Sequence, residues 1–483
     1  MNLILHGHSE QYAVEQLLMS LFPTEKITFV TENFSGDGVI STLSKGRVFL
    51  TATAKITLRG TTSHGTRRIE LVDETIPKRR QILQQAVYLA AMEHLETPPP
   101  WGAVSGVRPT KITTKSMLSG KTIRFCRDLM EKIYFVSPQR TQLCLDCSTA
   151  TLEAMDLLEP RDISLYVGIP FCPSRCTYCS FVSQTTERQA EMLPAFLEIL
   201  LEEIAETGKI FAGSNFRIRT VYIGGGTPTT LSADQMGRLM DGLSTHFDLS
   251  NVIEYTVEGG RPDTLDLEKL EVIRQKGADR MSINPQTMED EILKSIGRRH
   301  TTAMTVEAYH LAKQAGFEGI NMDLIAGLPG DTLEGFARSV NQVLALEPTN
   351  ITIHTLAVKK GSDLIAQKRK LLSTADMSAM VDYAETALRS AGYAPYYLYR
   401  QKYMSGSFEN VGWCKPGFVG LYNIYMMEEI HSIVALGGGG MNKINMPNGK
   451  IERFHNPKYP KEYMERLPET LKQKEQMLFL MNN

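Results

Sequence analysis

Hydrophobic positions recur along this chain with two different periods, and together they predict an α/β protein. From about residue 165 onward, apolar runs of strand length alternate with longer segments whose apolar residues recur at helical spacing. We expect strands at 165–169, 220–223, 253–257, 280–283, 319–325 and 350–356, and helices at 192–206, 233–247, 265–276, 305–316 and 333–346. Repeated β–α units of this length predict a parallel sheet with crossover helices. Six units, fewer than the eight of a closed barrel, predict a partial (β/α)6 barrel.

Two further regions flank these repeats. The first 150 residues show a smaller α/β pattern, with strands expected at 3–5, 46–58 and 68–71 and helices at 11–22 and 76–95. Consecutive prolines at 98–100 end the second of these helices, because proline cannot continue a helix. In the tail we expect a helix near 374–391, a glycine-rich turn at 437–440 and a charged helix from 461. We therefore divide the chain at 1–150, 160–360 and 361–483.

Composition narrows the class of protein. The 483 residues are 42% hydrophobic and 22% charged, which is ordinary for a globular protein of two or three domains. A formal charge of −2 argues against a chain-wide nucleic-acid surface, although a basic stretch follows residue 107. No apolar run approaches the roughly 18–20 residues that span a bilayer, and the first residues do not resemble a signal peptide. The 7 cysteines are an odd, sparse set, so we expect a reducing, cytoplasmic location.

Three of these cysteines form the first chemical signal. Cys172, Cys176 and Cys179 follow the first barrel strand with the spacing C-x3-C-x2-C, at the strand end where α/β proteins place their chemistry. Three thiolates on one loop suit three irons of a [4Fe–4S] cluster and leave the fourth iron open. The amino and carboxylate groups of S-adenosylmethionine (SAM) suit that open iron.

Other interpretations of the cysteines stay open at this point. Zinc sites of structural type prefer four ligands, often in paired C-x2-C units. A redox pair needs only two thiols, and polar Ser174 and Arg175 between the cysteines argue against a simple buried core. The separate pair Cys144 and Cys147 is a weak signal, and Cys414 is expected to be a packed thiol.

The segment from Tyr166 to Tyr178 resembles the cluster loop of radical SAM enzymes, and most of all the oxygen-independent coproporphyrinogen III oxidase (coproporphyrinogen dehydrogenase) family. The resemblance extends from about residue 164 to 442, and the additional N-terminal domain is similar to the HemZ-type subgroup. It implies that the three cysteines hold a [4Fe–4S] cluster, that SAM is the second cofactor and that the C-terminal region forms a cap.

Further motifs recur in the order that the resemblance implies. Residues 224–228, in the sequence Gly-Gly-Gly-Thr-Pro, let backbone approach a ligand closely, although such a run is also a common turn. Glu258 and Asp323 stand on barrel strands, where carboxylates can take an ammonium or ribose hydroxyls or serve only as structural groups. The resemblance implies that the SAM-binding residues are Tyr166, Gly224, Gly225, Gly226, Thr227, Glu258, Gln286, Arg298, Asp323, Ile325 and Ala357. Ile325 and Ala357 would line an adenine pocket, although core packing would give the same pattern.

The sequence also departs from the family pattern. Gly168 replaces the histidine of the usual His-Ile-Pro-Phe-Cys, and Phe181 stands where the oxidases carry a further cysteine. Asn284-Pro285 precede Gln286 in place of Gly-Val, and Gly259-Gly260-Arg261-Pro262 replace a pattern resembling Asn-Pro after Glu258.

These observations lead to one expected function and two alternatives. The resemblance implies radical SAM decarboxylation of coproporphyrinogen III to protoporphyrinogen IX in anaerobic haem biosynthesis. The alternatives are a haem-binding carrier of the same family without decarboxylase activity, or a radical SAM enzyme acting on haem or RNA. We expect a tetrapyrrole partner and an electron donor such as flavodoxin or ferredoxin. We expect neither a membrane span nor a nucleic-acid partner for the main function. No catalytic residue is assigned.

Overall fold

The computed structural model describes residues 1–483 except 33, 181–183, 358–371, 402–407, 447 and 483. The chain forms two compact units. Unit 1 comprises Met1–Ser148 and Tyr399–Glu409, and unit 2 comprises Thr149–Leu398 and Asn410–Asn483. A short segment far along the sequence therefore belongs to the N-terminal unit. The predicted boundary at 360–361 lies outside the described residues.

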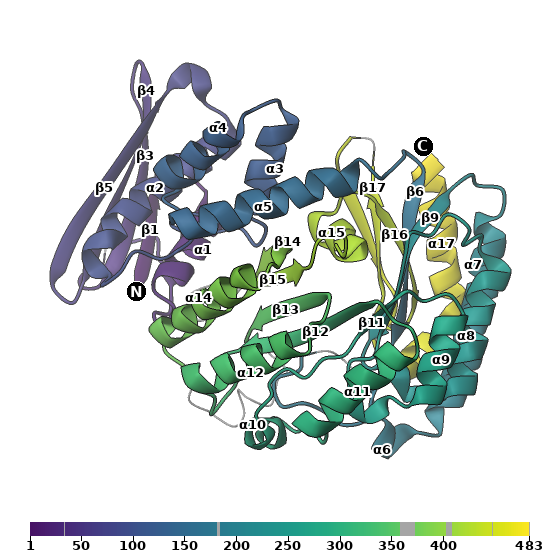
Figure 1. Ribbon diagram of the computed structural model, residues 1–483. Helices are drawn as coiled ribbons and strands as arrows, with labels where there is room; N and C mark the ends of the chain where they lie inside the picture. Colours follow the sequence, from purple (N-terminus) through teal and green to yellow (C-terminus); the bar gives the residue numbers. More distant parts are fainter. Residues whose placement is uncertain (33, 181–183, 358–371, 402–407, 447, 483) are drawn as a thin grey trace. The chain divides into compact units, whose positions relative to one another are not determined.

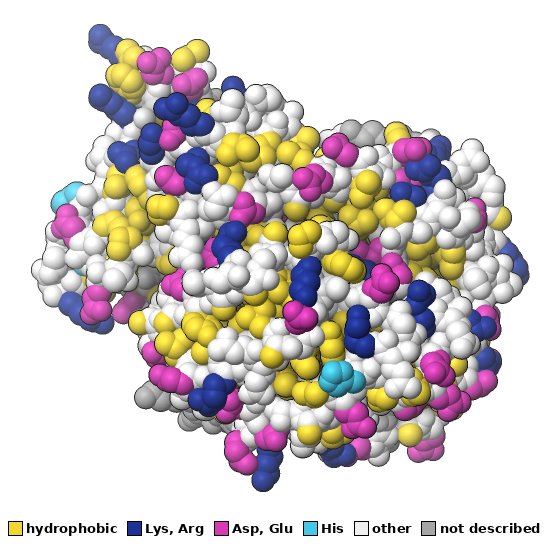
Figure 2. Space-filling view, viewed as in Figure 1, with side chains coloured by type: hydrophobic (Ala, Val, Ile, Leu, Met, Phe, Trp, Pro, Cys, Tyr) yellow, Lys and Arg dark blue, Asp and Glu magenta, His cyan; other side chains and the backbone are white. Residues whose placement is uncertain are grey.

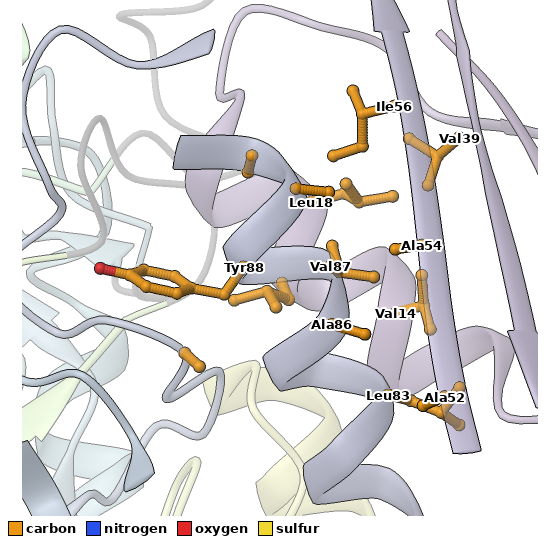
Figure 3. Packing of buried hydrophobic residues seen from close by; sticks show 14 of the residues in the cluster. Val14, Leu18, Val39, Ala52, Ala54, Ile56, Leu83, Ala86, Val87 and Tyr88 are labelled. Atoms are coloured by element: carbon orange, nitrogen blue, oxygen red, sulfur yellow. The ribbon is translucent and has the colours of Figure 1, made fainter. Parts of the chain in front are cut away.

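Unit 1 is built on a five-stranded sheet of order β2-β1-β3-β4-β5. Its strands are β1 (Asn2–His6), β2 (Thr28–Phe29), β3 (Gly38–Lys45), β4 (Phe49–Leu58) and β5 (Thr61–Glu70). Helices α1 (Gln11–Leu21) and α2 (Ile76–Ala91) cover the sheet. Their apolar faces, which include Leu18 and Val87, pack against Val39, Ala54 and Ile56 of the strands (Figure 3). Apolar residues that recur every 3.6 residues in the helices and every two residues in the strands are thus buried in one core.

The rest of unit 1 is helical and holds a buried ion pair. Its helices are α3 (Thr110–Leu118), α4 (Ile123–Asp128) and α5 (Pro138–Met155), the last of which continues into unit 2. Glu409 is 1% exposed, accepts a hydrogen bond from Trp101 Nε1 at 2.6 Å and lies 2.6 Å from Arg140 Nε. This pairing ties the segment 399–409 to unit 1.

Unit 2 contains the six predicted barrel strands as neighbours in one sheet. They are β6 (Asp162–Ile169), β9 (Arg217–Gly225), β10 (Glu254–Glu258), β11 (Arg280–Ser282), β12 (Gly319–Ala326) and β13 (Asn350–Thr355). Each is parallel to the next in the order β6-β9-β10-β11-β12-β13. The connecting helices lie along one face of this sheet (Figure 1) and are α7 (Met192–Phe211), α8 (Ala233–His246), α9 (Leu267–Gln275), α10 (Asp290–Ser295), α11 (Thr302–Gln314) and α12 (Leu333–Ala345). The predicted α/β class and its parallel repeats are confirmed.

The tail extends the same sheet at both edges, which the sequence pattern did not indicate. Strands β14 (Ala394–Arg400) and β15 (Glu409–Cys414) lie beyond β13, whereas β16 (Ser432–Gly437), β17 (Met441–Asn445) and β18 (Ile451–His455) lie beyond β6. Helices α14 (Thr374–Ser390), α15 (Leu421–Glu428), α16 (Pro460–Glu465) and α17 (Leu467–Asn482) complete the tail. The sheet therefore has 11 strands among the described residues, because the tail pairs with both edge strands of the predicted set. Two short strands, β7 (Phe171–Cys172) and β8 (Gln184–Thr185), and helix α6 (Thr186–Gln189) follow β6.

Charge is mixed on the face of the molecule that Figure 2 shows. In the view of Figure 2, basic and acidic side chains are interspersed over the visible face, as the formal charge of −2 would lead one to expect. Among the described residues, no helix is both long and apolar enough to cross a membrane.

Candidate functional site

The cysteine loop begins at the carboxyl end of β6, the first strand of the parallel set. Cys172 lies in β7, Cys176 is 8% exposed, and Cys172 and Cys179 are half-buried. The amide of Cys179 donates to the carbonyl of Cys176 at 3.1 Å, so a turn separates these two cysteines. Within the described part of the chain, no three His, Cys, Asp or Glu side chains form a ready metal site. The three thiols as cluster ligands therefore stay a prediction.

The glycine-rich segment after β9 packs directly against the cysteine loop. The amide of Gly226 donates to the Ile169 carbonyl at 2.8 Å, and the amide of Thr227 donates to the Phe171 carbonyl at 2.7 Å. Thr227 Oγ1 donates to Cys172 Sγ at 3.5 Å. A Cβ at Gly226 would lie 2.4 Å from the Phe171 carbonyl oxygen and 3.0 Å from Cys172 Sγ. Only glycine permits this approach, so two motifs that the sequence placed on separate strands form one surface.

A second glycine contact explains the first departure from the family pattern. Strand β16 pairs with β6 so that Gly437 stands opposite Gly168. A Cβ at Gly168 would lie 2.5 Å from the Gly438 carbonyl oxygen, and one at Gly437 would lie 2.3 Å from the Gly168 carbonyl oxygen. Backbone therefore occupies the space that a histidine side chain would need at position 168.

Glu258 is a half-buried carboxylate at the end of β10. Its Oε2 accepts a hydrogen bond from the Gly225 amide at 3.3 Å, and the Tyr222 hydroxyl also donates to it. Burial and the nearby charge of Asp323 raise the pKa of Glu258 to about 7. A cationic ligand beside this carboxylate would favour its ionised form.

Asp323 on β12 is held by partners from its own strand and from the neighbouring strand β13. Asn321 Nδ2 donates to its Oδ1 at 2.8 Å, and His354 Nε2 on β13 lies 3.5 Å from its Oδ2. Burial opposes the charge of Asp323, but hydrogen bonds from His354, Asn321 and Thr352 outweigh it and lower the pKa. Burial opposes the charge of His354 likewise, yet the bond to Asp323 leaves its pKa raised. Asp323 is thus an ionised, half-buried carboxylate on β12.

Gln286 follows β11 and pairs with β12 in a left-handed conformation, with φ of 71°. Its amide donates to the Asp323 carbonyl at 2.9 Å, and its carbonyl accepts from the Ile325 amide at 2.9 Å. A non-glycine residue at positive φ stores strain, which often accompanies a functional site. The unusual Asn284-Pro285 precedes this residue, so the departure from the family motif lies directly before the residue with positive φ.

Arg298 connects the loop after β11 to the cysteine loop. Its Nη1 donates to the Asn284 carbonyl at 2.6 Å and to the Gly260 carbonyl at 3.3 Å, and its Nη2 donates to the Tyr178 hydroxyl at 3.2 Å. Its buried Nε has no hydrogen-bond partner among the described residues. One donor of a fixed cation is therefore left over for an anionic ligand group.

The apolar members of the predicted site lie close by. Ile325 is 6% exposed and packs with Ile296 and Leu328, with Tyr178 of the cysteine loop against the same cluster. Ala357 is half-buried two residues after β13. Tyr166 on β6 stacks with Tyr222 of β9 and with Tyr422 of α15, at ring-centroid separations of 6.3 and 6.4 Å.

Sequence reasoning missed several residues of this site. Tyr222 precedes Gly224 by two positions, so strand alternation alone could have placed it on the same face. His354 stands opposite Ile325 in the β12–β13 register, which a pairing of the predicted strands could have suggested. Tyr422 comes from the tail and stacks on Tyr222 at 4.5 Å, and no sequence signal points to it.

The four cysteines outside the loop are all buried. Cys144 and Cys147 lie on α5 with 0% and 1% exposure, and Cys144 Sγ lies 3.2 Å from Thr113 Oγ1. Cys414 is 3% exposed, and burial raises the pKa of its thiol to about 12, as expected of a packed thiol.

A parallel α/β sheet with a C-x3-C-x2-C loop at one carboxyl end defines a radical SAM protein. The family described as the Radical SAM superfamily matches residues 166–343. The chain is 40% identical over 387 residues to the oxygen-independent coproporphyrinogen-III oxidase-like protein HemZ of Bacillus subtilis, a match covering 79% of this chain and 77% of that protein. It therefore belongs to the radical SAM superfamily, in the family of oxygen-independent coproporphyrinogen III oxidase and its HemZ-type relatives.

The chain is also similar to a second relative and to a solved structure. The heme chaperone HemW of Bacillus subtilis is 37% identical over 199 residues, which are 41% of this chain and 51% of that protein. The structure of coproporphyrinogen III oxidase (HemN) from Escherichia coli, described as a radical SAM enzyme, matches with a TM-score of 0.54 and 25% identity, over 67% of this chain and 73% of that one. The expected partial-barrel fold is confirmed by this match.

Membership of the superfamily gives the protein its cofactors, a [4Fe–4S] cluster and SAM. The residues present fit both groups. Three thiols supply the soft ligands that iron prefers. Gly224–Gly226 form a cradle in which side chains would clash, since a Cβ at Gly224 would lie 2.8 Å from Glu258 Oε2. The unpartnered donor of Arg298 is available to a carboxylate.

Proposed function

We propose that this protein catalyses the oxidative decarboxylation of coproporphyrinogen III to protoporphyrinogen IX, with Cys172, Cys176 and Cys179 holding the cluster. The observation that carries the proposal is the direct packing of the glycine cradle on the cysteine loop, through Gly226 and Thr227. A cluster and a nucleotide must be adjacent for an electron to pass between them, and this packing makes their predicted sites adjacent. The similarity to the HemZ protein over most of both chains supports the choice of a tetrapyrrole substrate.

The chain's own residues have distinct tasks in this proposal. When bound, the cofactors supply the 5′-deoxyadenosyl radical that abstracts a hydrogen atom from the substrate. Glu258 accepts a hydrogen bond from the ammonium group of SAM. Arg298 donates a hydrogen bond from its unpartnered Nε–H to the SAM carboxylate. Asp323, kept ionised by His354, accepts hydrogen bonds from ribose hydroxyls. Holding the reactants in fixed positions is the main contribution of the protein.

The substrate chemistry follows from the product. A propionate becomes a vinyl group when one hydrogen atom leaves the carbon next to the ring, the carboxylate leaves as carbon dioxide, and one electron passes to a separate one-electron acceptor. Two propionates must react in this way. An electron donor of the flavodoxin or ferredoxin class and a cytoplasmic location complete the proposal.

Anaerobic reconstitution with iron and sulfide provides the test. The reconstituted protein is incubated with reductant, SAM and coproporphyrinogen III, and 5′-deoxyadenosine and porphyrins are quantified together. We expect both products from the unmodified chain, and neither product nor the brown chromophore from Cys176→Ser. Cys414→Ala is the matched control, because it removes a packed thiol outside the loop. Retained SAM cleavage in Cys176→Ser would reject the ligand assignment.

A haem-binding carrier is the second candidate. It is favoured by the similarity to the heme chaperone HemW of Bacillus subtilis and by Phe181 in place of the further cysteine of the oxidases; Phe181 itself lies outside the described residues. The same reconstituted protein is therefore titrated with haem. Stoichiometric haem binding without any decarboxylated porphyrin would favour the carrier. Formation of decarboxylated porphyrin would show that the protein is not a carrier alone.

A further inference from the structure

Arg261 is a buried arginine that the proposed function leaves without a role. It follows Glu258 in the segment that departs from the family pattern, and it is 2% exposed. A guanidinium so removed from water needs partners for its charge and for its donors. The identity of those partners shows what the side chain does.

Each nitrogen of the guanidinium has a defined partner. Nη1 donates to Cys176 Sγ at 3.4 Å, and Nη2 donates to Ser174 Oγ at 2.9 Å. Nε donates to Asp263 Oδ1 at 3.2 Å. Ser174 in turn donates to the Gly297 carbonyl at 3.0 Å. The side chain therefore spans from its own strand end to the middle of the cysteine loop, where it points one N–H at a predicted ligand sulfur.

The backbone of Arg261 is fixed as firmly as its side chain. The Gly260 amide donates to the Ser282 carbonyl at 3.1 Å, and the Arg261 carbonyl accepts from Thr264 Oγ1 at 2.7 Å. Lys269 Nζ holds the Thr264 carbonyl at 2.7 Å. With both ends fixed, the guanidinium cannot turn away from the sulfur without breaking several hydrogen bonds.

The charges around this part of the loop are few. Arg298 is a second guanidinium on the loop, through its bond to Tyr178 and its interaction with Cys176 itself. Asp263 offsets one positive charge. Burial and the charges of Arg298 and Arg261 lower the pKa of His300 to about 3, so its ring is neutral at pH 7. The surroundings of Cys176 are therefore net positive before any cofactor binds.

We propose that Arg261 is a positioning residue that donates a hydrogen bond to the Cys176 sulfur and raises the reduction potential of the cluster. The proposal rests on the proposed function, in which Cys176 is a ligand. Adding one electron to the cluster increases the negative charge on its sulfurs. A fixed positive group at hydrogen-bond distance stabilises that reduced form, and burial makes the effect stronger than it would be in water. A milder electron donor then suffices.

Redox titration of the reconstituted protein, followed by electron paramagnetic resonance of the reduced cluster, tests this role. Arg261→Gln removes the charge but retains a hydrogen-bond donor. Arg261→Lys keeps the charge but loses the planar set of donors that the guanidinium provides. Arg299→Gln is the matched control, because Arg299 is exposed and pairs with Glu187. We expect at least a tenfold lower equilibrium constant for reduction in Arg261→Gln, which is a potential about 59 mV more negative for one electron. Arg261→Lys should shift less, and Arg299→Gln should match the unmodified protein.

Iron and sulfide contents distinguish a wrong cluster-ligand assignment from a wrong role for Arg261 alone. If Cys176→Ser keeps the full cluster signal, the proposed ligand set is wrong, and the role of Arg261 is rejected with it. If Cys176→Ser loses the signal but Arg261→Gln and Arg261→Lys keep both full iron and the original potential, the inference alone is overturned. An equal shift in Arg299→Gln would also overturn it, since long-range charge would then explain the effect.

Discussion

Lys474→Met should destabilise unit 2 strongly, because it leaves Glu203 as an unpaired buried charge. Lys474 and Glu203 are both 0% exposed, and Lys474 Nζ lies 3.5 Å from Glu203 Oε1. Lys474 Nζ also donates to Asn442 Oδ1 at 2.9 Å and to the Ala435 carbonyl. The pair lies beneath the turn that contacts Gly168, since Glu203 Oε2 accepts from the Gly437 amide at 2.7 Å.

The size of the effect follows from this geometry. Two unit charges at the 3.5 Å separation of this pair attract each other by about 5 kcal/mol at an effective dielectric constant of about 20. Breaking a buried pair by removing one partner typically costs about 3–5 kcal/mol. With an m-value of about 3 kcal/mol/M, the urea midpoint of unit 2 should fall by about 1–1.7 M.

Pulse hydrogen exchange with mass spectrometry measures this for unit 2 alone, by following peptides from β6 and β16 across a urea series. Glu203→Gln in the Lys474→Met background removes the uncompensated charge and should recover part of the loss. Lys472→Met, two residues earlier on the same helix but exposed, is the control. The reasoning would be refuted if the urea midpoint of Lys474→Met lay within experimental error of that of the unmodified chain. It would also be refuted if the stability lost in the double variant equalled the sum of the losses in the two single variants.

The other predictions concern the site. Because the pKa of Glu258 is raised to about 7, SAM affinity should fall as the pH drops through 7, and Glu258→Gln should flatten that profile in equilibrium dialysis. Tyr222→Phe removes a hydrogen bond that lowers the pKa of Glu258, so the midpoint of the same profile should move to higher pH; an unmoved midpoint would contradict the assignment. Gly168→His, which restores the family residue, should lower stability by about 1–3 kcal/mol, because its Cβ would meet the Gly438 carbonyl; a thermal melt unchanged from the unmodified chain would show that the turn can move.

Gly168 illustrates how a departure from a family pattern can be explained by packing. Gly168, Gly224 and Gly437 stand in register on three neighbouring strands, so backbone lies against backbone above the cysteine loop. The replacement of histidine by glycine is therefore tied to the tail strand β16. The sequence shows the replacement, whereas its cause lies almost 270 residues further along the chain.

The parallel sheet and the cysteine loop could be predicted from the sequence because their signals are local. Strand-length apolar runs, helical spacing and three closely spaced thiols need no partner from elsewhere to be recognised. The same holds for Glu258 and Asp323, whose positions at the predicted strands made them candidates for the proposed site.

Only the tertiary structure decided which distant residues complete that site. The tail's strands pair with both edges of the predicted sheet, Tyr422 stacks on Tyr222, and Arg261 donates to Cys176 across a loop. Such contacts depend on sheet pairing and on where a buried charge finds its partner, and neither has a periodic trace in the sequence. The residue types thus fix what chemistry is available, and the packing fixes which of these groups meet.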